Sequence, residues 1–450
     1  MAGNEYDYTN GPINKAVVLL SIPMVLEMAM ESLFAIVDIF FVAKLGANAI
    51  SAVGLTEAVI TLIYAIAFGF GLAVTAVISR RVGEKNTDAA AVTAVQVLLL
   101  TLVVSILLGL VGLLYSEDLL GFMGAEQEVV DVGVDYTRIM LVFSVTIMTL
   151  FIVSSVFRGA GNPIIAMRAL WLANGLNIVL DPCFIFGYGP FPELGVTGAA
   201  VATNIGRGAG SVYLLYHLVA GNERIKIQWL HICVSWKIIS NLVQVSIGGI
   251  GQMIIATASW VLLMRLVSEF GSIAVAGYTI AIRIVIFAML PAWGISNAAA
   301  TLVGQNLGAK SAGRAEQSVW VALAYTAAYM FLVAIVMMVC REALIGFFNQ
   351  NTNIISVGSQ VLLIFSIAFT FFGMGMVLTQ ALNGAGDTAT PTWINFICFW
   401  LFQIPFAYFT SITLNWGPAG VFIAVALSDT FIFLLALWQF RLGKWKTMQV

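Results

Sequence analysis

The sequence predicts an all-α membrane protein with twelve transmembrane helices in two pseudo-symmetric six-helix lobes. Of its 450 residues 61% are hydrophobic and only 9% are charged, whereas about a quarter of the residues in an ordinary soluble domain are charged. Apolar runs long enough to cross a bilayer recur along the chain. The second half also repeats short motifs of the first. The low fraction of charged residues and the recurring apolar runs leave no room for a sizeable soluble domain.

Charged residues and Gly or Pro breaks separate the apolar runs. In the first half they predict helices at residues 15–42, 52–78, 91–115, 130–156, 165–187 and 195–217. In the second half they predict helices at residues 238–268, 275–303, 317–340, 355–382, 392–414 and 419–440. Each run reaches the roughly 20 residues that span the hydrocarbon core.

The distribution of Lys and Arg predicts the orientation. They concentrate in the even-numbered connections and the C-terminal tail, at Arg80, Arg81, Lys85, Arg158, Arg168, Arg224, Lys226, Lys237, Lys310, Arg314, Arg441, Lys444 and Lys446. The loop at 116–128 carries only acidic charges. Because cytoplasmic loops carry the excess of Lys and Arg, we expect a multi-pass protein of the cell (inner) membrane with both termini in the cytoplasm.

The two halves carry matching motifs. RRVGEKN around Gly83 parallels GQNLGAKS around Gly308, an offset of 308 − 83 = 225, and RGAGNP from Arg158 parallels NGAGDTATP from Asn383 at the same offset. Six helices separate equivalent points, so we expect parallel repeats related by an axis along the membrane normal. The predicted organisation is an N-terminal lobe at 1–217, a cytoplasmic linker at 218–237 and a C-terminal lobe at 238–450.

Intramembrane acids occur in the N-terminal lobe at positions whose repeat partners are uncharged. By the offset, Glu27, Glu31, Asp38 and Asp181 correspond to Gln252, Ala256, Leu263 and Phe406. Glu27, Glu31, Phe34 and Asp38 share one helix face, as do Asn174, Asn177 and Asp181. A charge near the bilayer centre costs roughly 3 kcal/mol, so such residues normally face a cavity or a partner.

Helix direction places one set of polar side chains at similar depth in the outer half of the membrane: Asp38, Tyr136, Asn177, Asp181 and Thr203. This set predicts a cation-coupling site, in which carboxylates share H⁺ or oxygens hold Na⁺; in the Na⁺ case the ligands are Asp38, Asn177, Asp181 and Thr203. A structural role stays open, with Asp38 at a helix end and Glu27 or Glu31 paired with an arginine.

A second set is predicted to bind an amphipathic or cationic substrate: Glu27, Glu31, Phe34, Met30 and Asn174. Pro23 breaks a backbone hydrogen bond in the first helix and is either a hinge or a static kink. Arg138 is expected to pair locally with Asp135 or Asp131. The charges of Arg207, Arg283 and Asp429 have no partner that the sequence identifies.

The motifs IPMVLEMAMESLFAIVDIFFVAKLG, RGAGNP, NIVLDP, GVTGAAVATNIG and NGAGDTATP resemble the multidrug and toxic compound extrusion (MATE) family over essentially the whole chain. The resemblance implies two six-helix lobes and antiport of organic cations or other amphipaths against Na⁺ or H⁺. Within the family the chain is similar to the DNA-damage-inducible (DinF-like) branch, which implies an N-lobe cation site at Asp38, Tyr136, Asn177, Asp181 and Thr203. The carboxylates of the norfloxacin-exporter branch, on helices 7 and 10, are absent.

The alternatives differ in class. A lipid-linked saccharide flippase of the same superfamily predicts an arginine-rich cavity, and only scattered arginines are present. An intramembrane enzyme needs a motif such as HExxH, which the sequence lacks, and a passive channel would not need asymmetric acids. The net charge of −2 gives no reason to expect a nucleic-acid partner. We therefore expect a monomeric, cofactor-free antiporter in the lipid bilayer, with H⁺ or Na⁺ as the coupling ion.

Overall fold

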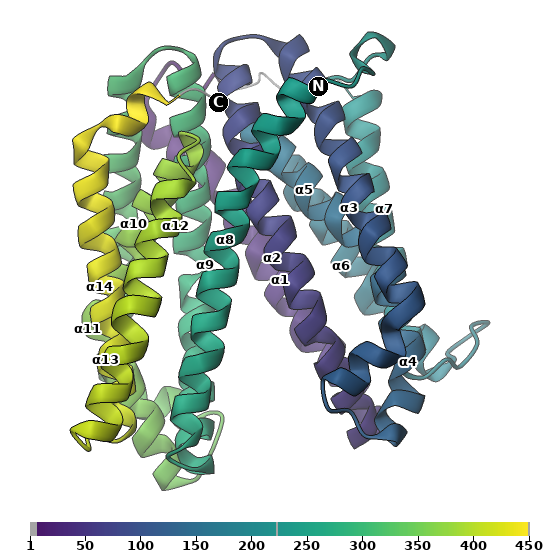
Figure 1. Ribbon diagram of the computed structural model, residues 1–450, viewed down its shortest axis with the longest axis vertical. Helices are drawn as coiled ribbons and strands as arrows, with labels where there is room; N and C mark the ends of the chain where they lie inside the picture. Colours follow the sequence, from purple (N-terminus) through teal and green to yellow (C-terminus); the bar gives the residue numbers. More distant parts are fainter. Residues whose placement is uncertain (1–6, 222–223, 449–450) are drawn as a thin grey trace. The chain divides into compact units, whose positions relative to one another are not determined.

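The structure is a computed structural model that describes residues 7–221 and 224–448. Every regular element in these two ranges is a helix (Figure 1). Nine of the described helices are long and apolar enough to cross a membrane, when the continuous helical stretch Ala389–Thr413 is counted as one. The bent pair α4 and α5, counted as one span, makes ten. The remaining two, α1 and α7, have 30 and 24 residues, enough for about 45 and 36 Å at 1.5 Å per residue. The predicted all-α membrane fold is confirmed.

The first half of the chain contains α1 (Ile13–Val42), α2 (Ala47–Gly83), α3 (Thr87–Phe122), α4 (Gln127–Val142), α5 (Ser144–Ala160), α6 (Pro163–Phe186) and α7 (Val196–Val219). The second half contains α8 (Trp236–Ser268), α9 (Ser272–Gly308), α10 (Ala312–Gly346), α11 (Thr352–Gly384), α12 (Ala389–Asn395), α13 (Ile404–Tyr408) and α14 (Pro418–Leu442). The segments α12 and α13 are joined by the π-helix η3 (Phe396–Gln403), and α13 continues into the π-helix η4 (Phe409–Thr413).

Two details differ from the sequence expectation. The helix expected at 130–156 is two helices, α4 and α5, bent by 42° at Phe143, whose backbone leaves the helical region (φ −93°, ψ 19°). The helix expected at 392–414 is partly π-helical. Apolar periodicity averages over several turns, so it does not detect a break or a widened turn of a few residues.

The chain divides into two compact units. Of the described residues, we call those from 26 to 244 unit 1, and those from 7 to 25 together with those from 245 to 448 unit 2. Both α1 and α8 are shared between the units, and α1 passes from unit 2 to unit 1 between Val25 and Leu26, two residues after Pro23. The lobe and linker boundaries expected from the sequence stay a prediction, and residues 222 and 223 of that linker lie outside the described ranges.

The backbone carries the same repeat as the sequence. Lys85 and Lys310, 225 residues apart, both adopt a left-handed conformation with φ 58°, two residues after the ends of α2 and α9. The helices α7 and α14 begin after Gly195 and Gly417, both with positive φ. Their offset is 417 − 195 = 222 and not 225, because the connection before α14 (414–417) is shorter than that before α7 (187–195). The repeated conformations support the internal repeat.

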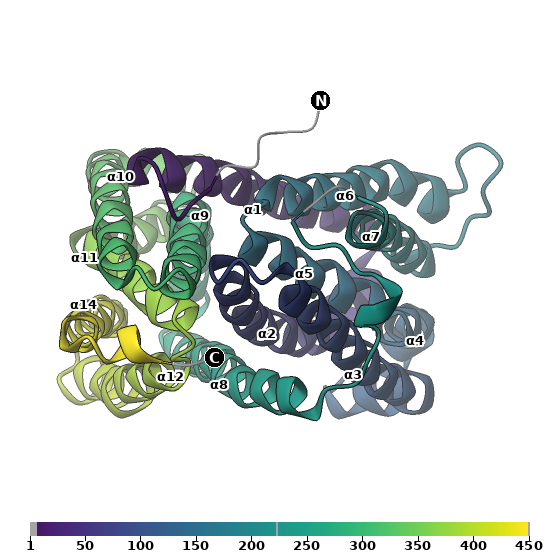
Figure 2. The ribbon, with the colours of Figure 1, turned by 90° about the horizontal axis from the view of Figure 1, so that it is seen from above.

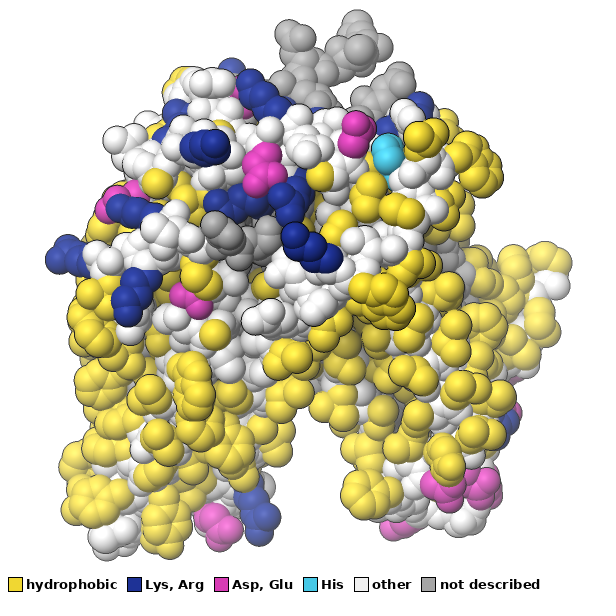
Figure 3. Space-filling view, turned by 45° about the horizontal axis from the view of Figure 1, so that its top comes forward, with side chains coloured by type: hydrophobic (Ala, Val, Ile, Leu, Met, Phe, Trp, Pro, Cys, Tyr) yellow, Lys and Arg dark blue, Asp and Glu magenta, His cyan; other side chains and the backbone are white. Residues whose placement is uncertain are grey.

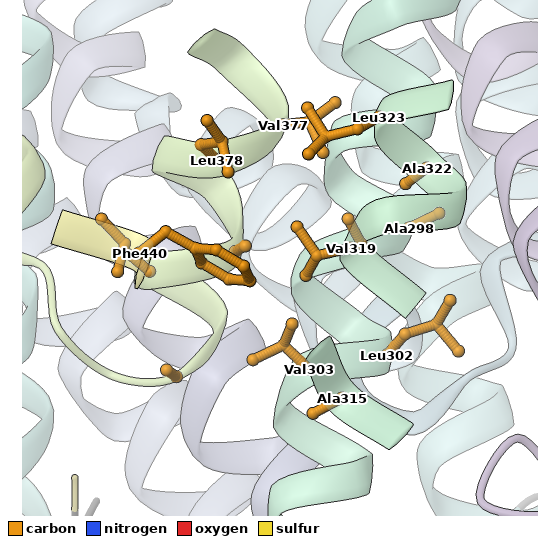
Figure 4. Packing of buried hydrophobic residues seen from close by; sticks show 14 of the residues in the cluster. Ala298, Leu302, Val303, Ala315, Val319, Ala322, Leu323, Val377, Leu378 and Phe440 are labelled. Atoms are coloured by element: carbon orange, nitrogen blue, oxygen red, sulfur yellow. The ribbon is translucent and has the colours of Figure 1, made fainter. Parts of the chain in front are cut away.

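Unit 2 is held together by apolar packing among α9, α10, α11 and α14 (Figure 2). One of its buried clusters combines small and large side chains, among them Ala298, Val319 and Leu302 (Figure 4). Alanines at these positions let the helices approach closely, and close van der Waals contact is a main driving force for helix association in lipid.

On the face shown in Figure 3 most Lys and Arg side chains lie toward the top of the view, while hydrophobic side chains cover the length of the helices. In unit 2 the start of α10 contacts both ends of the chain. Arg314 donates hydrogen bonds to the carbonyls of Tyr8 and Asn10, and Lys446 pairs with Glu316 at 2.6 Å. The described parts nearest the two termini therefore lie at the same end of unit 2, as an even number of spans requires.

Candidate functional site

Close packing of α6 against α7 in unit 1 positions the first part of the site (Figure 2). Glycines on α7 face α6 at four- or eight-residue spacing, and a Cβ atom on Gly206 would lie 2.4 Å from the Ala173 backbone oxygen. Only glycine permits this approach. It brings Thr203 of α7 next to Asn177 of α6.

Asn177 joins two of the predicted coupling residues. Its Nδ2 donates hydrogen bonds to Asp181 Oδ1 and to Thr203 Oγ1, both at 3.0 Å. All three side chains are buried, and Asp181 is 0% exposed. Asp181 Oδ2 and Asn177 Oδ1 have no hydrogen-bond partner within the described part of the chain. Buried oxygens are normally satisfied, so the Asp181 carboxylate can take up a proton and both oxygens can contact a cation.

Asp38 and Tyr136 belong to the same electrostatic cluster. Asp38 lies close enough to Asp181 for the two carboxylates to interact electrostatically. Both carboxylates also interact electrostatically with the buried Tyr136 hydroxyl. The five predicted coupling residues therefore come together from α1, α4, α6 and α7. Asp38 is partly exposed and makes no hydrogen bond with a described residue, so it is the accessible acid of the pair.

Arg207 of α7 lies among the polar side chains of unit 1, a position that the sequence did not predict. It donates a hydrogen bond to the Tyr64 hydroxyl, and its guanidinium lies 5.4 Å from the centre of the Phe34 ring. Its acidic neighbours are Glu31 and Glu57. Arg207 is 4% exposed, so it is a fixed positive charge among the acids.

Glu57 and Tyr64 of α2 were missed by the sequence reasoning. The Glu57 side chain is exposed, and its carboxylate interacts electrostatically with Asp38 and Arg207. The signal was available: the repeat partner of Glu57 is Ile282, so the comparison that selected the other acids also selects this one. Tyr64 packs edge-on against Phe151 at 5.3 Å between ring centres, and it had no comparable signal among the many aromatic residues.

The predicted substrate residues divide into two groups. Glu31 accepts a hydrogen bond from Asn174 Nδ2 at 2.9 Å, and Met30 and Glu31 are both partly exposed. Phe34 is 8% exposed, with the Arg207 guanidinium near its ring. Glu31 and Met30 are thus reachable, whereas Phe34 already has a cation beside it.

Glu27 makes the arginine pair that was the structural alternative. Its Oε1 accepts a hydrogen bond from Arg158 Nη1 at 2.5 Å, and the two side chains are 1% and 11% exposed. Arg158 also donates to Ser155 at 2.7 Å. The pair ties α1 to α5. Arg138 pairs with Asp135 at 3.1 Å, which confirms the local ion pair expected there.

We expect Arg158→Gln to destabilise the protein strongly, because it leaves the Glu27 carboxylate buried without its cation. Breaking a buried pair from one side costs about 3–5 kcal/mol, whereas an exposed pair contributes about 0–1 kcal/mol. Thermal unfolding of purified protein in detergent measures the difference. Arg138→Gln, which breaks the exposed pair with Asp135, is the matched control. Equal melting temperatures for the two variants would contradict the structural role of the pair.

No group of three or more His, Cys, Asp or Glu side chains able to hold a metal ion occurs in residues 7–221 and 224–448. The oxygen set of Asp38, Asn177, Asp181 and Thr203 contains only two carboxylates. A hydroxyl and an amide oxygen beside two carboxylates suit a monovalent cation better than a transition metal.

These features are typical of a membrane transporter: apolar helices in two repeated units, with buried polar side chains between the helices of unit 1. The sequence profile of the MatE family matches residues 23–183 and 250–409. The chain therefore belongs to the MATE family. The expectation of a transporter and not an enzyme is confirmed by this membership; the DinF-like branch stays a prediction.

Relatives match over nearly the full length. The "Probable multidrug resistance protein NorM" of Thermotoga maritima is 26% identical over 97% of this chain and 94% of that protein. The "Probable multidrug resistance protein YpnP" of Bacillus subtilis is 25% identical over 99% and 98%. A solved structure described as the "Outward-facing conformation of a multidrug resistance MATE family transporter of the MOP superfamily" superposes with a TM-score of 0.92, at 25% identity and full coverage of both chains.

Proposed function

We propose that this protein is a secondary antiporter that exports organic cations or other amphipathic drugs in exchange for H⁺ or Na⁺ by alternating access. Relatives named as multidrug resistance proteins support the substrate class. The coupling ion is proposed to bind among Asp38, Tyr136, Asn177, Asp181 and Thr203. The flippase alternative has less support, because the polar cluster of unit 1 contains more acids than arginines.

One observation carries the coupling proposal. Two buried oxygens, on Asp181 and Asn177, lack a hydrogen-bond partner in the described residues, although Asn177 already holds Asp181 and Thr203. Leaving such groups unsatisfied costs about 1–3 kcal/mol each. A bound proton or Na⁺ removes that cost, and this gain in free energy favours binding of the ion at this point in the membrane interior.

The substrate is proposed to meet the same charges. Glu31, Met30 and Asn174 offer one carboxylate, a soft apolar side chain and an amide on neighbouring helices, and Glu27 and Phe34 lie on the same face of α1. Proton or Na⁺ binding at Asp38 lowers the negative potential there, so drug and ion compete. Alternating access requires that the ion bind one arrangement of the lobes more tightly and the drug the other. A ratio of about a hundredfold between the affinities for the two arrangements is sufficient for tight coupling.

The decisive experiment measures both transport and binding. Purified protein in liposomes, with proton and sodium gradients imposed separately, should export a fluorescent organic cation such as ethidium only when one gradient is present. Equilibrium ethidium affinity should fall at low pH or high Na⁺, lose that dependence in Asp38→Asn and be reduced in Phe34→Ala. A wild-type affinity that responds to neither ion would contradict direct competition.

Pro23 is proposed to allow α1 to bend during transport. It lies inside α1, two residues before the helix passes from unit 2 to unit 1, and proline removes the backbone hydrogen bond that resists bending. Pro23→Ala should slow turnover severalfold while ethidium affinity changes little. Stopped-flow efflux and equilibrium binding on the same preparation separate the two effects. Weaker binding with unchanged turnover per bound drug would exclude a hinge at Pro23.

The orientation and assembly also remain proposals. Both termini are proposed to be cytoplasmic, in the cell (inner) membrane, because Lys and Arg concentrate in the even-numbered connections and the C-terminal tail of the sequence. The protein is proposed to act as a monomer without a cofactor. Cysteine accessibility from each side of the membrane, with Cys introduced near residue 447, would test the orientation.

A further inference from the structure

Unit 2 contains a cavity of about 350 Å³ that the proposed antiport mechanism does not use. Four elements line it: α8, α9, α11 and α14, with a contribution from the π-helix η3. All of the lining residues belong to unit 2. Its size falls in the range of small-molecule sites, which typically occupy about 300–1,000 Å³.

The cavity wall is mainly aromatic and aliphatic, with a few polar groups. The rings come from Trp260, Tyr278, Phe365, Phe369, Phe372 and Phe399. Ser259 and Gln403 are hydrogen-bonded to each other at 3.0 Å, which satisfies the serine hydroxyl. The charged side chain in the described lining is Asp429.

Asp429 has no counter-ion within the described ranges. No charged side chain there acts on its carboxylate, and it makes no hydrogen bond with a described residue. Its oxygens are nonetheless not enclosed, because they are absent from the fully buried unsatisfied atoms of the described chain. A carboxylate that is open to an aromatic cavity and lacks a cation of its own can accept one from a ligand.

The internal repeat explains why the charge is uncompensated. With the offset of 222 that relates α7 to α14, Asp429 occupies the position of Arg207. With the offset of 225 that relates the earlier helices, the acids around Arg207 are replaced by apolar side chains that line the cavity: Glu31 by Ala256, Asp38 by Leu263 and Glu57 by Ile282. Unit 1 surrounds a fixed cation with acids, whereas unit 2 places a single acid among apolar groups.

From this charge reversal we propose that the cavity of unit 2 binds a monovalent organic cation with an aromatic body, with Asp429 as its counter-ion. The rings of the wall supply both apolar contact and attraction to the positive charge. The site is separate from the coupling cluster and does not depend on ion antiport. An anion of similar size is excluded by the same carboxylate.

Equilibrium binding of ethidium to purified protein in nanodiscs, followed by fluorescence polarisation, tests the proposal. The measurement uses a Glu31→Gln, Asp38→Asn background, so that ethidium bound among the acids of unit 1 does not obscure the signal. In this background Asp429→Asn should weaken ethidium affinity about tenfold or more. Ala426→Phe, which fills the cavity without removing a charge, should weaken it as well.

Glu342→Gln is the matched control, because Glu342 is an exposed acid of unit 2 outside the cavity lining, and it should leave the affinity unchanged. Unchanged affinity in Asp429→Asn, or a similar loss in Glu342→Gln, would overturn the proposal, as would equally tight binding of the anionic dye anilinonaphthalene sulfonate at the same cavity. The test needs no ion gradient, so its failure and a failure of the antiport proposal are distinguishable.

Discussion

Asp38→Asn and Asp181→Asn should each abolish gradient-driven efflux, with a reduction of at least a hundredfold, while the protein stays folded. Asparagine keeps the size of the side chain but cannot take up a proton, and it weakens the attraction for Na⁺. In Asp181→Asn the Asn177 hydrogen bond to Oδ1 can be retained. The loss should therefore come from missing charge and not from a collapsed site. Ethidium efflux from liposomes under imposed proton and sodium gradients measures it.

Asp135→Asn is the matched control for these two variants. Asp135 lies on α4, one residue from Tyr136, but it is exposed and pairs locally with Arg138. Its neutralisation should leave efflux near the wild-type rate. Wild-type efflux in Asp38→Asn and Asp181→Asn would remove both residues from the coupling mechanism.

Gly206→Ala should lower both stability and transport, through packing and not through charge. The added Cβ would lie 2.4 Å from the Ala173 backbone oxygen and 3.2 Å from the Asn177 backbone nitrogen, so α7 has to move away from α6. Overpacking of this kind typically costs about 1–3 kcal/mol. The same movement would separate Thr203 from Asn177. Thermal unfolding in detergent and ethidium efflux in liposomes measure the two consequences.

Gly208→Ala provides the control on the same helix, because the nearest atom to a Cβ there is Thr146 Cγ2 at an ordinary 3.9 Å. That variant should be as stable as the wild type or slightly more so, since alanine favours the helix. If both glycine variants unfold at the same temperature, close approach of α6 and α7 is not what positions the site.

Most residues of the candidate site could be selected from the sequence because charges inside a membrane are rare and costly. Glu27, Glu31, Asp38 and Asp181 were selected by their absence from the second half, and helical spacing put them on shared faces. The same comparison applies to Glu57, which was overlooked. The pairing of Glu27 with Arg158 could not be assigned, because the two residues are 131 positions apart and several other arginines were equally available.

The sequence alone determined the class of fold, the repeat and the helices, because a bilayer requires long apolar segments and satisfied backbone groups whatever their neighbours are. The tertiary structure decided what each charged side chain contacts. It placed Arg207 among the acids of unit 1 and left Asp429, at the equivalent position, without a counter-ion in the described part of unit 2. The reason is physical: hydropathy is a property of one segment, whereas an electrostatic partner depends on distances between side chains on different helices, and those distances exist only after the helices pack.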